Sequence, residues 1–270
     1  MTPAMRLLVT RPQPQADEWV ARLRTSGIDA RALPLIAIGP PADASAVHDT
    51  WHALQSHRLL MFVSPAAVEW FFKLRPADAA WPPHCLAATP GPGTARALLE
   101  AGHAVGLREA QLCVPPPDAG QFDSEHLWPV LAPLDWKGQR VTIVGGGEGQ
   151  SVKGRSWLMA RLQERGAIVT TLLAYERGPG TWQADDVALA RDAMAEPAQH
   201  MWLFSSSQAI AYLIDHHLPR WSFAVPAWQA HHALTTHPRI AEQARRMGFG
   251  HVEEVRPTLE AVVQARRPGG

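Results

Sequence analysis

The sequence predicts an α/β protein made of two similar domains, each built around a parallel sheet. Two observations predict this class: short apolar runs alternate with amphipathic helical patterns, and the order of these units repeats once along the chain. Parallel strands must be joined by crossover connections, which helices provide, so the alternation indicates parallel sheets with helices on both faces. A chain of 270 residues has room for two such domains.

Four apolar runs are the clearest candidate strands. Each is followed by a turn of Ser, Thr, Gly or Pro and then by a helical pattern, as in a β-α unit. After the first run, for example, Trp19, Val20 and Leu23 fall on one face of a helix. The runs cover residues 7–9, 59–62, 141–144 and 201–204.

Three internal matches indicate that the chain is duplicated. They occur in the same order and lie about 140 residues apart, which a single short match would not establish. Residues 21–27 match 160–166, residues 62–72 match 204–214, and residues 89–96 match 235–242.

The order of the repeats predicts that one domain is discontinuous. The first β-α unit resembles the third and the second resembles the fourth, and each domain needs one unit of each kind. The middle of the chain holds one complete set, so the other set is split between the two ends and the chain crosses between the domains twice. Segments bordered by Pro and Gly mark the crossings, and we expect them to act as a hinge. The predicted parts are a discontinuous domain at residues 1–34 and 179–270, an inserted domain at 40–172, and hinge strands at 35–39 and 173–178.

Composition excludes several classes of function. Lys plus Arg and Asp plus Glu both number 25, so no excess of positive charge favours nucleic-acid binding. No apolar run approaches the roughly 20 residues that span a bilayer, and the first run is too short for a signal peptide. The sequence therefore predicts a cytoplasmic protein that binds neither nucleic acid nor membrane.

Hydroxyl side chains and glycines gather in the loops that follow the predicted strands. In open α/β sheets, ligands bind beyond the carboxyl ends of the strands, where helices begin. Free N–H groups and hydroxyls at helix starts bind carboxylate or phosphate without any net charge on the protein. Any single Ser or Thr there is more simply a helix N-cap, but six such loops favour a polyanion-binding cleft between the domains. The loops are residues 10–12, 63–65, 89–94, 145–149, 205–207 and 235–239.

The sequence predicts no metal ion, nucleotide or other cofactor. Residues 149–156 read G-x-x-x-x-G-R-S, which differs from a phosphate-binding P-loop because Arg155 replaces the essential lysine. The 13 histidines form no H-x-x-x-H with a partnered Glu, and Cys85 and Cys113 lack metal-site spacing.

Six short motifs, taken in their order and spacing, resemble the uroporphyrinogen-III synthase family over essentially the whole chain. They are LVTRP at 8–12, FVSPAAV at 62–68, PGPGTA at 90–95, GAIV at 166–169 with YER at 175–177, FSS at 204–206, and TTHPRIA at 235–241. The resemblance implies two α/β domains joined by a two-stranded antiparallel linker. It also implies a cofactor-free lyase of haem biosynthesis, which cyclises hydroxymethylbilane to uroporphyrinogen III with D-ring inversion and loss of water. Hydroxymethylbilane synthase is the partner expected to hand over the substrate.

The resemblance also assigns candidate site residues. Tyr175 matches the family's tyrosine, which can donate a proton or a hydrogen bond to the departing hydroxyl. Val63 stands where family members commonly have Thr, and Gly145 where they often have Arg, so Arg155 is expected to substitute on that side. The predicted substrate-binding residues are Thr10, Arg11, Ser64, Thr94, Arg155, Ser206 and Thr236.

Two other classes of function stay open at this point. A non-catalytic two-domain module that binds a polyanionic small molecule is the main alternative, and a nucleotide-dependent transferase ranks third. Tyr175 in the second hinge strand, together with the absence of a fused output domain, favours the enzyme. On the residues alone, Tyr175 either overlooks the cleft or is a half-buried tyrosine whose hydroxyl lies in water.

Overall fold

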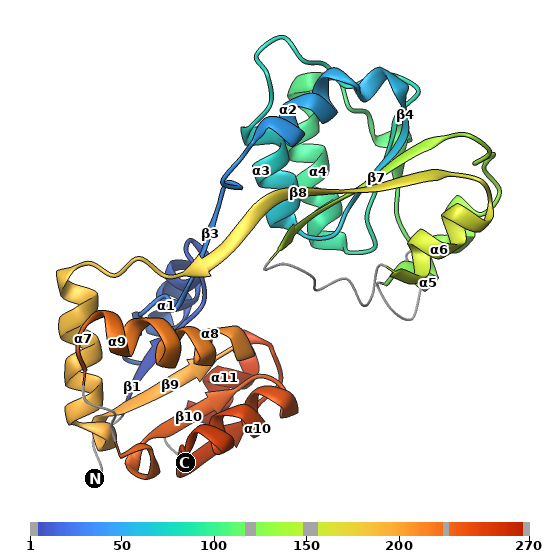
Figure 1. Ribbon diagram of the computed structural model, residues 1–270. Helices are drawn as coiled ribbons and strands as arrows, with labels where there is room; N and C mark the ends of the chain where they lie inside the picture. Colours follow the sequence, from blue (N-terminus) through green and yellow to red (C-terminus); the bar gives the residue numbers. More distant parts are fainter. Residues whose placement is uncertain (1–4, 117–122, 148–155, 224–226, 267–270) are drawn as a thin grey trace. The chain divides into compact units, whose positions relative to one another are not determined.

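The chain forms two compact α/β units. The computed structural model describes residues 5–116, 123–147, 156–223 and 227–266. Unit 1 comprises residues 1–37 and 178–270, and unit 2 comprises residues 38–177. Each unit has a largely parallel sheet flanked by helices (Figure 1), so the predicted α/β class is confirmed.

Unit 1 contains a five-stranded sheet in the order β11-β10-β9-β1-β2, with every neighbouring pair parallel. Its strands are β1 (Arg6–Val9), β2 (Ala30–Ala32), β9 (His200–Phe204), β10 (His232–Thr235) and β11 (His251–Glu254). Its helices are α1 (Gln15–Thr25), α7 (Ala184–Ala195), α8 (Ser207–Tyr212), α9 (Leu218–Arg220), α10 (Pro238–Met247) and α11 (Leu259–Arg266). Because side chains alternate along a strand, Leu7 and Val9 pack with α1 and α11, whereas Leu8 packs with α7, α8 and α10.

Unit 2 contains a six-stranded sheet in the order β3-β8-β7-β4-β5-β6. Its strands are β3 (Ile36–Gly39), β4 (His57–Phe62), β5 (Leu86–Ala88), β6 (Leu112–Cys113), β7 (Arg140–Gly147) and β8 (Ile168–Pro179). Its helices are α2 (Ser45–His52), α3 (Pro65–Lys73), α4 (Pro92–Gly102), α5 (Ser124–Leu131) and α6 (Ser156–Glu164). Leu60 and Phe62 pack with α2, α3 and α4, and Leu59 and Met61 pack with α5 and α6 on the other face.

The two sheets have the same strand order. Strands β11, β10, β9, β1 and β2 of unit 1 correspond in turn to β6, β5, β4, β7 and β8 of unit 2. This correspondence pairs the first β-α unit with the third and the second with the fourth, as the sequence repeat requires. Two differences remain: unit 2 has the additional strand β3 beside β8, and β8 has 12 residues where β2 has 3.

Two neighbouring strands, β3 and β8, carry the chain from one unit to the other. On the unit 1 side, the Gly180 N–H donates to Leu35 O at 3.0 Å, and Trp182 Nε1 donates to Pro34 O at 2.9 Å. On the unit 2 side, the Ala42 N–H donates to Glu176 Oε1 at 3.2 Å. These contacts fix each end of the two strands within its own unit, and a hinge between them stays a prediction.

No helix in the described part of the chain is both long enough and apolar enough to cross a membrane.

Candidate functional site

The predicted site residues lie at the carboxyl ends of parallel strands. In unit 1 they follow β1, β9 and β10, just before α1, α8 and α10. In unit 2 they lie directly before α3, in the first turn of α4 and on β8. Each sheet therefore gathers its candidates at the edge where helices begin, which is the edge that binds ligands in open α/β folds.

A β-bulge sets the position of Tyr175. The register between β7 and β8 shifts there: Gly145 lies opposite Leu173, but Gly146 lies opposite Tyr175, so Ala174 is the extra residue. Sequence neighbours normally point to opposite faces of a strand. Ala174 and Tyr175 nevertheless belong to the same apolar cluster, because the bulge turns the tyrosine onto that face.

The hydroxyl of Tyr175 is held by two side chains. The ring is only 2% exposed, so it is buried rather than half-buried. Its Oη lies 3.2 Å from Ser64 Oγ and accepts a hydrogen bond of 3.2 Å from Arg177 Nη2. Since a guanidinium can only donate, this bond leaves the tyrosine's own proton free to be directed elsewhere. Tyr175 and Ser64, which the sequence singled out separately, are thus brought together.

The sequence interpretation missed Arg177 as part of this group. The available signal was the spacing of Tyr175 and Arg177, because residues two apart on a strand share a face. The guanidinium carbon of Arg177 also lies 5.7 Å from the centroid of the Tyr175 ring, within range of a cation–π contact. Arg177 therefore contacts both the ring and the hydroxyl of the candidate catalytic residue.

Two more predicted hydroxyls of unit 2 lie at helix starts. Ser64 is the N-cap of α3, and its Oγ accepts a hydrogen bond of 3.2 Å from the Ala67 N–H. Thr94 lies in the first turn of α4 and is 5% exposed, so it is buried rather than open to solvent. Ser64 thus serves both as an N-cap and as a neighbour of the tyrosine, so the two roles do not exclude one another.

The predicted loop at 145–149 needs correction. Gly145, Gly146 and Gly147 belong to β7, so this strand extends three glycines beyond the apolar run. The physical reason is that β8 continues alongside and pairs with all three residues. Arg155, the predicted substitute for a missing arginine, lies outside the described residues, as does the neighbouring insertion.

In unit 1, Arg11 is a cation held against an aromatic ring. Its guanidinium carbon lies 3.9 Å from the centroid of the Trp19 ring. Its Nε is buried without a hydrogen-bond partner, and no carboxylate of the described residues forms an ion pair with it. Burial lowers the pKa of Arg11, but a guanidinium stays protonated at neutral pH. The site therefore holds a positive charge that can accept an anion.

Thr10, beside it, does not present its hydroxyl to solvent. The side chain is 1% exposed, and Oγ1 donates to Leu203 O at 2.7 Å. This bond ties the end of β1 to β9. Thr10 therefore holds the Arg11 loop in position, and its hydroxyl is not available to a ligand in solvent.

The loops after β9 and β10 complete the unit 1 edge. Ser206 is the N-cap of α8 and accepts from the Gln208 N–H at 3.1 Å. The neighbouring Ser205 lies in the same predicted loop but was not among the predicted substrate-binding residues, and its Oγ is buried with no hydrogen-bond partner among the described residues. Thr236 is 7% exposed, and its N–H donates to Phe204 O at 3.2 Å. These hydroxyls therefore follow two adjacent strands, β9 and β10.

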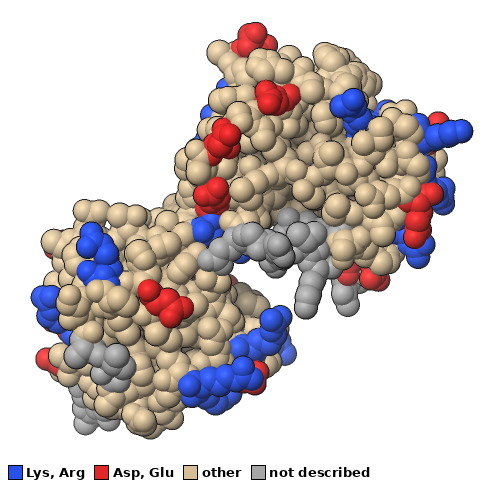
Figure 2. Space-filling model, in the orientation of Figure 1, with Lys and Arg blue, Asp and Glu red and all other residues tan. Residues whose placement is uncertain are grey.

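A basic side chain of α10 accompanies this edge. Figure 2 shows Lys and Arg side chains over α10 in unit 1, where Arg239, Arg245 and Arg246 are exposed. Arg245 and Arg246 lie in the last turn of the helix, toward the amino ends of the strands, and Arg246 is paired with Glu242. Arg239 lies in the first turn of α10, directly after the Thr236 loop, so its charge is placed on the side of the sheet where anions are expected.

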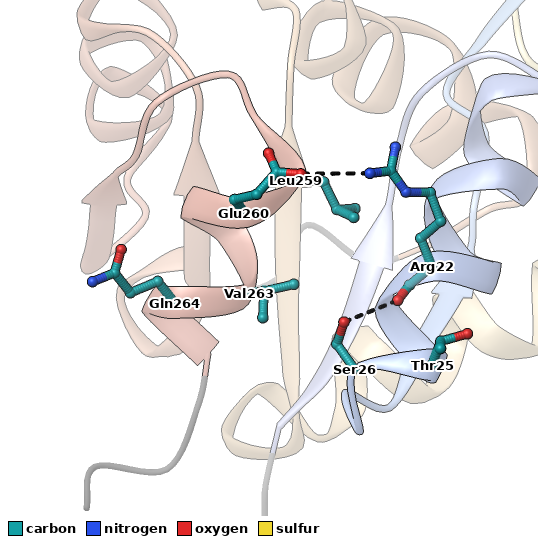
Figure 3. A pocket seen from close by; sticks show the side chains of 7 residues that line it. All are labelled: Arg22, Thr25, Ser26, Leu259, Glu260, Val263 and Gln264. Atoms are coloured by element: carbon teal, nitrogen blue, oxygen red, sulfur yellow. Dashed lines mark hydrogen bonds and ion pairs between the residues drawn. The ribbon is translucent and has the colours of Figure 1, made fainter.

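A surface hollow lies elsewhere on unit 1. Figure 3 shows it between the end of α1 and α11, with Arg22 and Glu260 lying 3.5 Å apart across it. Helix α1 starts after β1 and ends before β2 begins, so its last turn lies toward the amino ends of the strands. The hollow is therefore separate from the predicted site residues.

Among the described residues, His, Cys, Asp and Glu form no group of at least 3 that could hold a metal ion. The candidate site residues instead bring together hydroxyl groups, helix N-termini and arginine side chains. These groups suit the binding of a polycarboxylate and the transfer of a proton.

Comparisons with known proteins point to one family. The family model described as "Uroporphyrinogen-III synthase HemD" matches residues 17–264. Uroporphyrinogen-III synthase of Escherichia coli (strain K12) is 29% identical over 262 residues, covering 92% of this chain and 94% of that protein. Uroporphyrinogen-III synthase of Proteus mirabilis is 27% identical over 176 residues, covering 64% of this chain and 80% of that protein.

Solved structures show the same fold. The Helicobacter pylori 26695 uroporphyrinogen-III synthetase matches with a TM-score of 0.53 at 13% identity, covering 97% of each chain. A mutant uroporphyrinogen III synthase from Thermus thermophilus matches with a TM-score of 0.52 at 16% identity, also covering 97% of each chain. At these identities the likeness concerns the fold alone. Because the family model spans nearly the whole sequence, this protein belongs to the uroporphyrinogen-III synthase family.

Proposed function

We propose that this protein is a uroporphyrinogen-III synthase, a cyclising lyase of tetrapyrrole biosynthesis. It converts hydroxymethylbilane to uroporphyrinogen III with inversion of the D ring and loss of water. The observation that carries the proposal is the family match over residues 17–264. The buried Tyr175 group, with Ser64 and Arg177 at its hydroxyl, supports catalysis rather than binding alone.

The reaction needs help for the departure of the hydroxyl group and control over how the substrate is folded. The C–O bond of the hydroxymethyl group breaks, and the hydroxyl leaves as water after it takes a proton. The resulting azafulvene is attacked by the substituted D-ring carbon, which forms a spiro-pyrrolenine. Fragmentation and reclosure of that intermediate invert the ring. Without the enzyme the chain closes head to tail without inversion, so holding the substrate folded is a large part of catalysis.

In this proposal Tyr175 supplies the proton or hydrogen bond to the departing hydroxyl. Arg177 donates to the tyrosine oxygen, and the Ser64 hydroxyl can donate to it as well. When both bonds point at the oxygen, the tyrosine's O–H must point away from them, toward a bound substrate. The Ala67 N–H donates to Ser64 Oγ, so the position of this oxygen beside Tyr175 is set before the substrate arrives.

The remaining predicted residues are proposed to bind carboxylates. Arg11 is the strongest candidate, because its charge is partly buried and stacked on Trp19. The hydroxyls of Ser206, Thr94 and Thr236 fit the same role at helix starts, and Arg155 stays a candidate on sequence grounds. Thr10 is proposed to position the Arg11 loop, since its hydroxyl donates to Leu203 O.

A cytoplasmic location and direct hand-over from hydroxymethylbilane synthase are part of the proposal. The substrate closes spontaneously to the wrong isomer, so a short path between the two enzymes limits that loss. A mixture of the two enzymes should therefore release less isomer I than the same enzymes used one after the other.

A coupled assay that resolves product isomers tests the proposed function. Hydroxymethylbilane is generated in situ, with EDTA present and no nucleotide added, and the porphyrins are separated after oxidation. We expect isomer III with the protein and isomer I without it. If the protein binds hydroxymethylbilane but only isomer I forms, at the rate seen without protein, the non-catalytic binding module is correct. Isomer III that appears only after zinc or magnesium is added would overturn the cofactor-free reaction.

A further inference from the structure

Gly146 lies directly against the ring of Tyr175. A methyl group at Gly146 would place its carbon 2.1 Å from Cζ, 2.2 Å from Cε2 and 2.4 Å from Cε1 of the tyrosine. Carbon atoms in contact stay about 3.5–4.0 Å apart, so the ring occupies the space that a side chain would fill. The ring of Tyr175 therefore sits in a notch that only glycine leaves open.

The backbone gives no other reason for glycine at this position. Gly146 is absent from the described glycines with positive φ, which are Gly27, Gly106, Gly138, Gly166 and Gly248. Any residue can therefore adopt its conformation, and the requirement concerns space rather than backbone freedom.

The tyrosine cannot simply move aside. Its ring is 2% exposed and packs in the cluster that contains Phe62 and Phe71. Its hydroxyl is tied to Ser64 and Arg177, each at 3.2 Å. To make room for a methyl group at Gly146, the ring would have to move until its carbons reached normal contact distance. That movement would break these bonds or press the ring into a close-packed core.

We propose that Gly146 is a positioning residue for Tyr175. The missing side chain lets the ring lie close to β7, which places the hydroxyl between Ser64 and Arg177. This inference rests on the proposed catalytic role of Tyr175. It also gives a function to one member of the glycine run, which departs from the family pattern at the neighbouring Gly145.

The first test compares Gly146→Ala with Thr171→Val. Thr171 lies at an exposed position on β8, outside the predicted hinge segment, so it serves as the control. We expect Gly146→Ala to lower kcat roughly 100-fold with a small change in KM, because misplacement by about 1 Å costs that much. Thr171→Val should stay within about twofold of the wild type. Wild-type kcat in Gly146→Ala would overturn the proposal.

A double variant separates positioning from a general loss of structure. In Tyr175→Ala the added methyl has no ring to meet, so Gly146→Ala should cause no further loss of activity and little further loss of melting temperature. Gly146→Ala should therefore lower the melting temperature of the wild type more than it lowers the melting temperature of Tyr175→Ala. An equal loss of melting temperature in the two backgrounds, or effects on kcat that multiply, would overturn the proposal.

Failure of the proposed catalytic role of Tyr175 can be told apart from failure of the proposed positioning role of Gly146. If Tyr175→Phe keeps full kcat, the proposed role of the tyrosine is wrong, whatever Gly146→Ala does. The melting temperatures report the contact between Gly146 and the ring independently of turnover. A stability coupling without a kinetic one would therefore show a packing contact and reject Gly146 as a positioning residue.

Discussion

The two units share a strand order but differ in what their equivalent segments carry. In unit 2, the strand that corresponds to β2 is extended to 12 residues, and the extension holds Tyr175 and Arg177. In unit 1, the loop after β1 carries Arg11 on Trp19, whereas the corresponding β7 ends in glycines. Duplication thus supplied one scaffold twice. The proposed proton donor arose on one copy and the best-placed cation on the other.

A second pair of equivalent residues shows the same divergence inside the core. His57 and His200 begin β4 and β9, and the Nδ1 atom of each faces a carbonyl four residues earlier, at 3.0 Å and 3.1 Å. In the neutral imidazole Nδ1 must donate there, so Nε2 is the acceptor. His57 Nε2 meets Thr142 Oγ1 at 3.0 Å. In unit 1 the position of Thr142 is taken by Leu8, and His200 Nε2 is buried without a partner among the described residues. Histidines at equivalent positions of the two units therefore need not have the same hydrogen-bond partners.

The largest effect is expected for Tyr175→Phe in unit 2. Removing the hydroxyl should lower kcat roughly 100-fold and change KM little, because its bond to the leaving group strengthens as that group departs. Steady-state kinetics with isomer III as the measured product checks this. An unchanged kcat would mean that Tyr175 has only a packing role.

A smaller effect, on KM rather than on kcat, is expected for Arg11→Gln in unit 1. Loss of a charge-assisted bond to a substrate carboxylate should raise KM about tenfold and leave kcat nearly unchanged. Arg22→Gln is the control, since Arg22 is an exposed arginine on the same loop-helix unit. If kcat falls while KM stays constant, the comparison between binding in unit 1 and proton transfer in unit 2 fails.

The smallest effect concerns stability. Thr142→Val leaves His57 Nε2 without its buried donor, so we expect the free energy of unfolding to fall by about 1–3 kcal/mol. Thr171→Val, at an exposed position on β8, should change it by less than about 0.5 kcal/mol. Urea unfolding monitored by circular dichroism measures both. Equal values for the two variants would show that the partner of His57 contributes no stability.

Local patterns in the sequence predicted much of the fold. The α/β class followed from the alternation of apolar runs with helical patterns, and the repeat predicted two similar domains, which the structure shows to share a strand order. Ser64 and Ser206 begin helices as N-caps because their hydroxyls satisfy free N–H groups, a local effect that single-sequence reasoning captures.

The details of the candidate site depend on contacts between distant segments. Strand β7 continues through glycines with low strand propensity because β8 pairs with them, which no local pattern reveals. The bulge at Ala174 breaks the alternation that predicts which residues share a face, so the burial of Tyr175 was not foreseen. Trp19 was predicted only as one residue of an apolar helix face, and its contact with Arg11 depends on how the loop returns to α1.

The pairing of β1 with β9 has a consequence for the newborn chain. The ribosome makes β1, α1 and β2 first, but their two strands alone form a sheet too small to be stable in water. The central strand of that sheet, β9, begins only at His200, after the whole of unit 2 has been made. Unit 2 is continuous in sequence and can fold as a domain when residue 177 has emerged. During translation, the segment that holds β1 therefore waits, with Leu7, Leu8 and Val9 incompletely buried, until β9 has been synthesised.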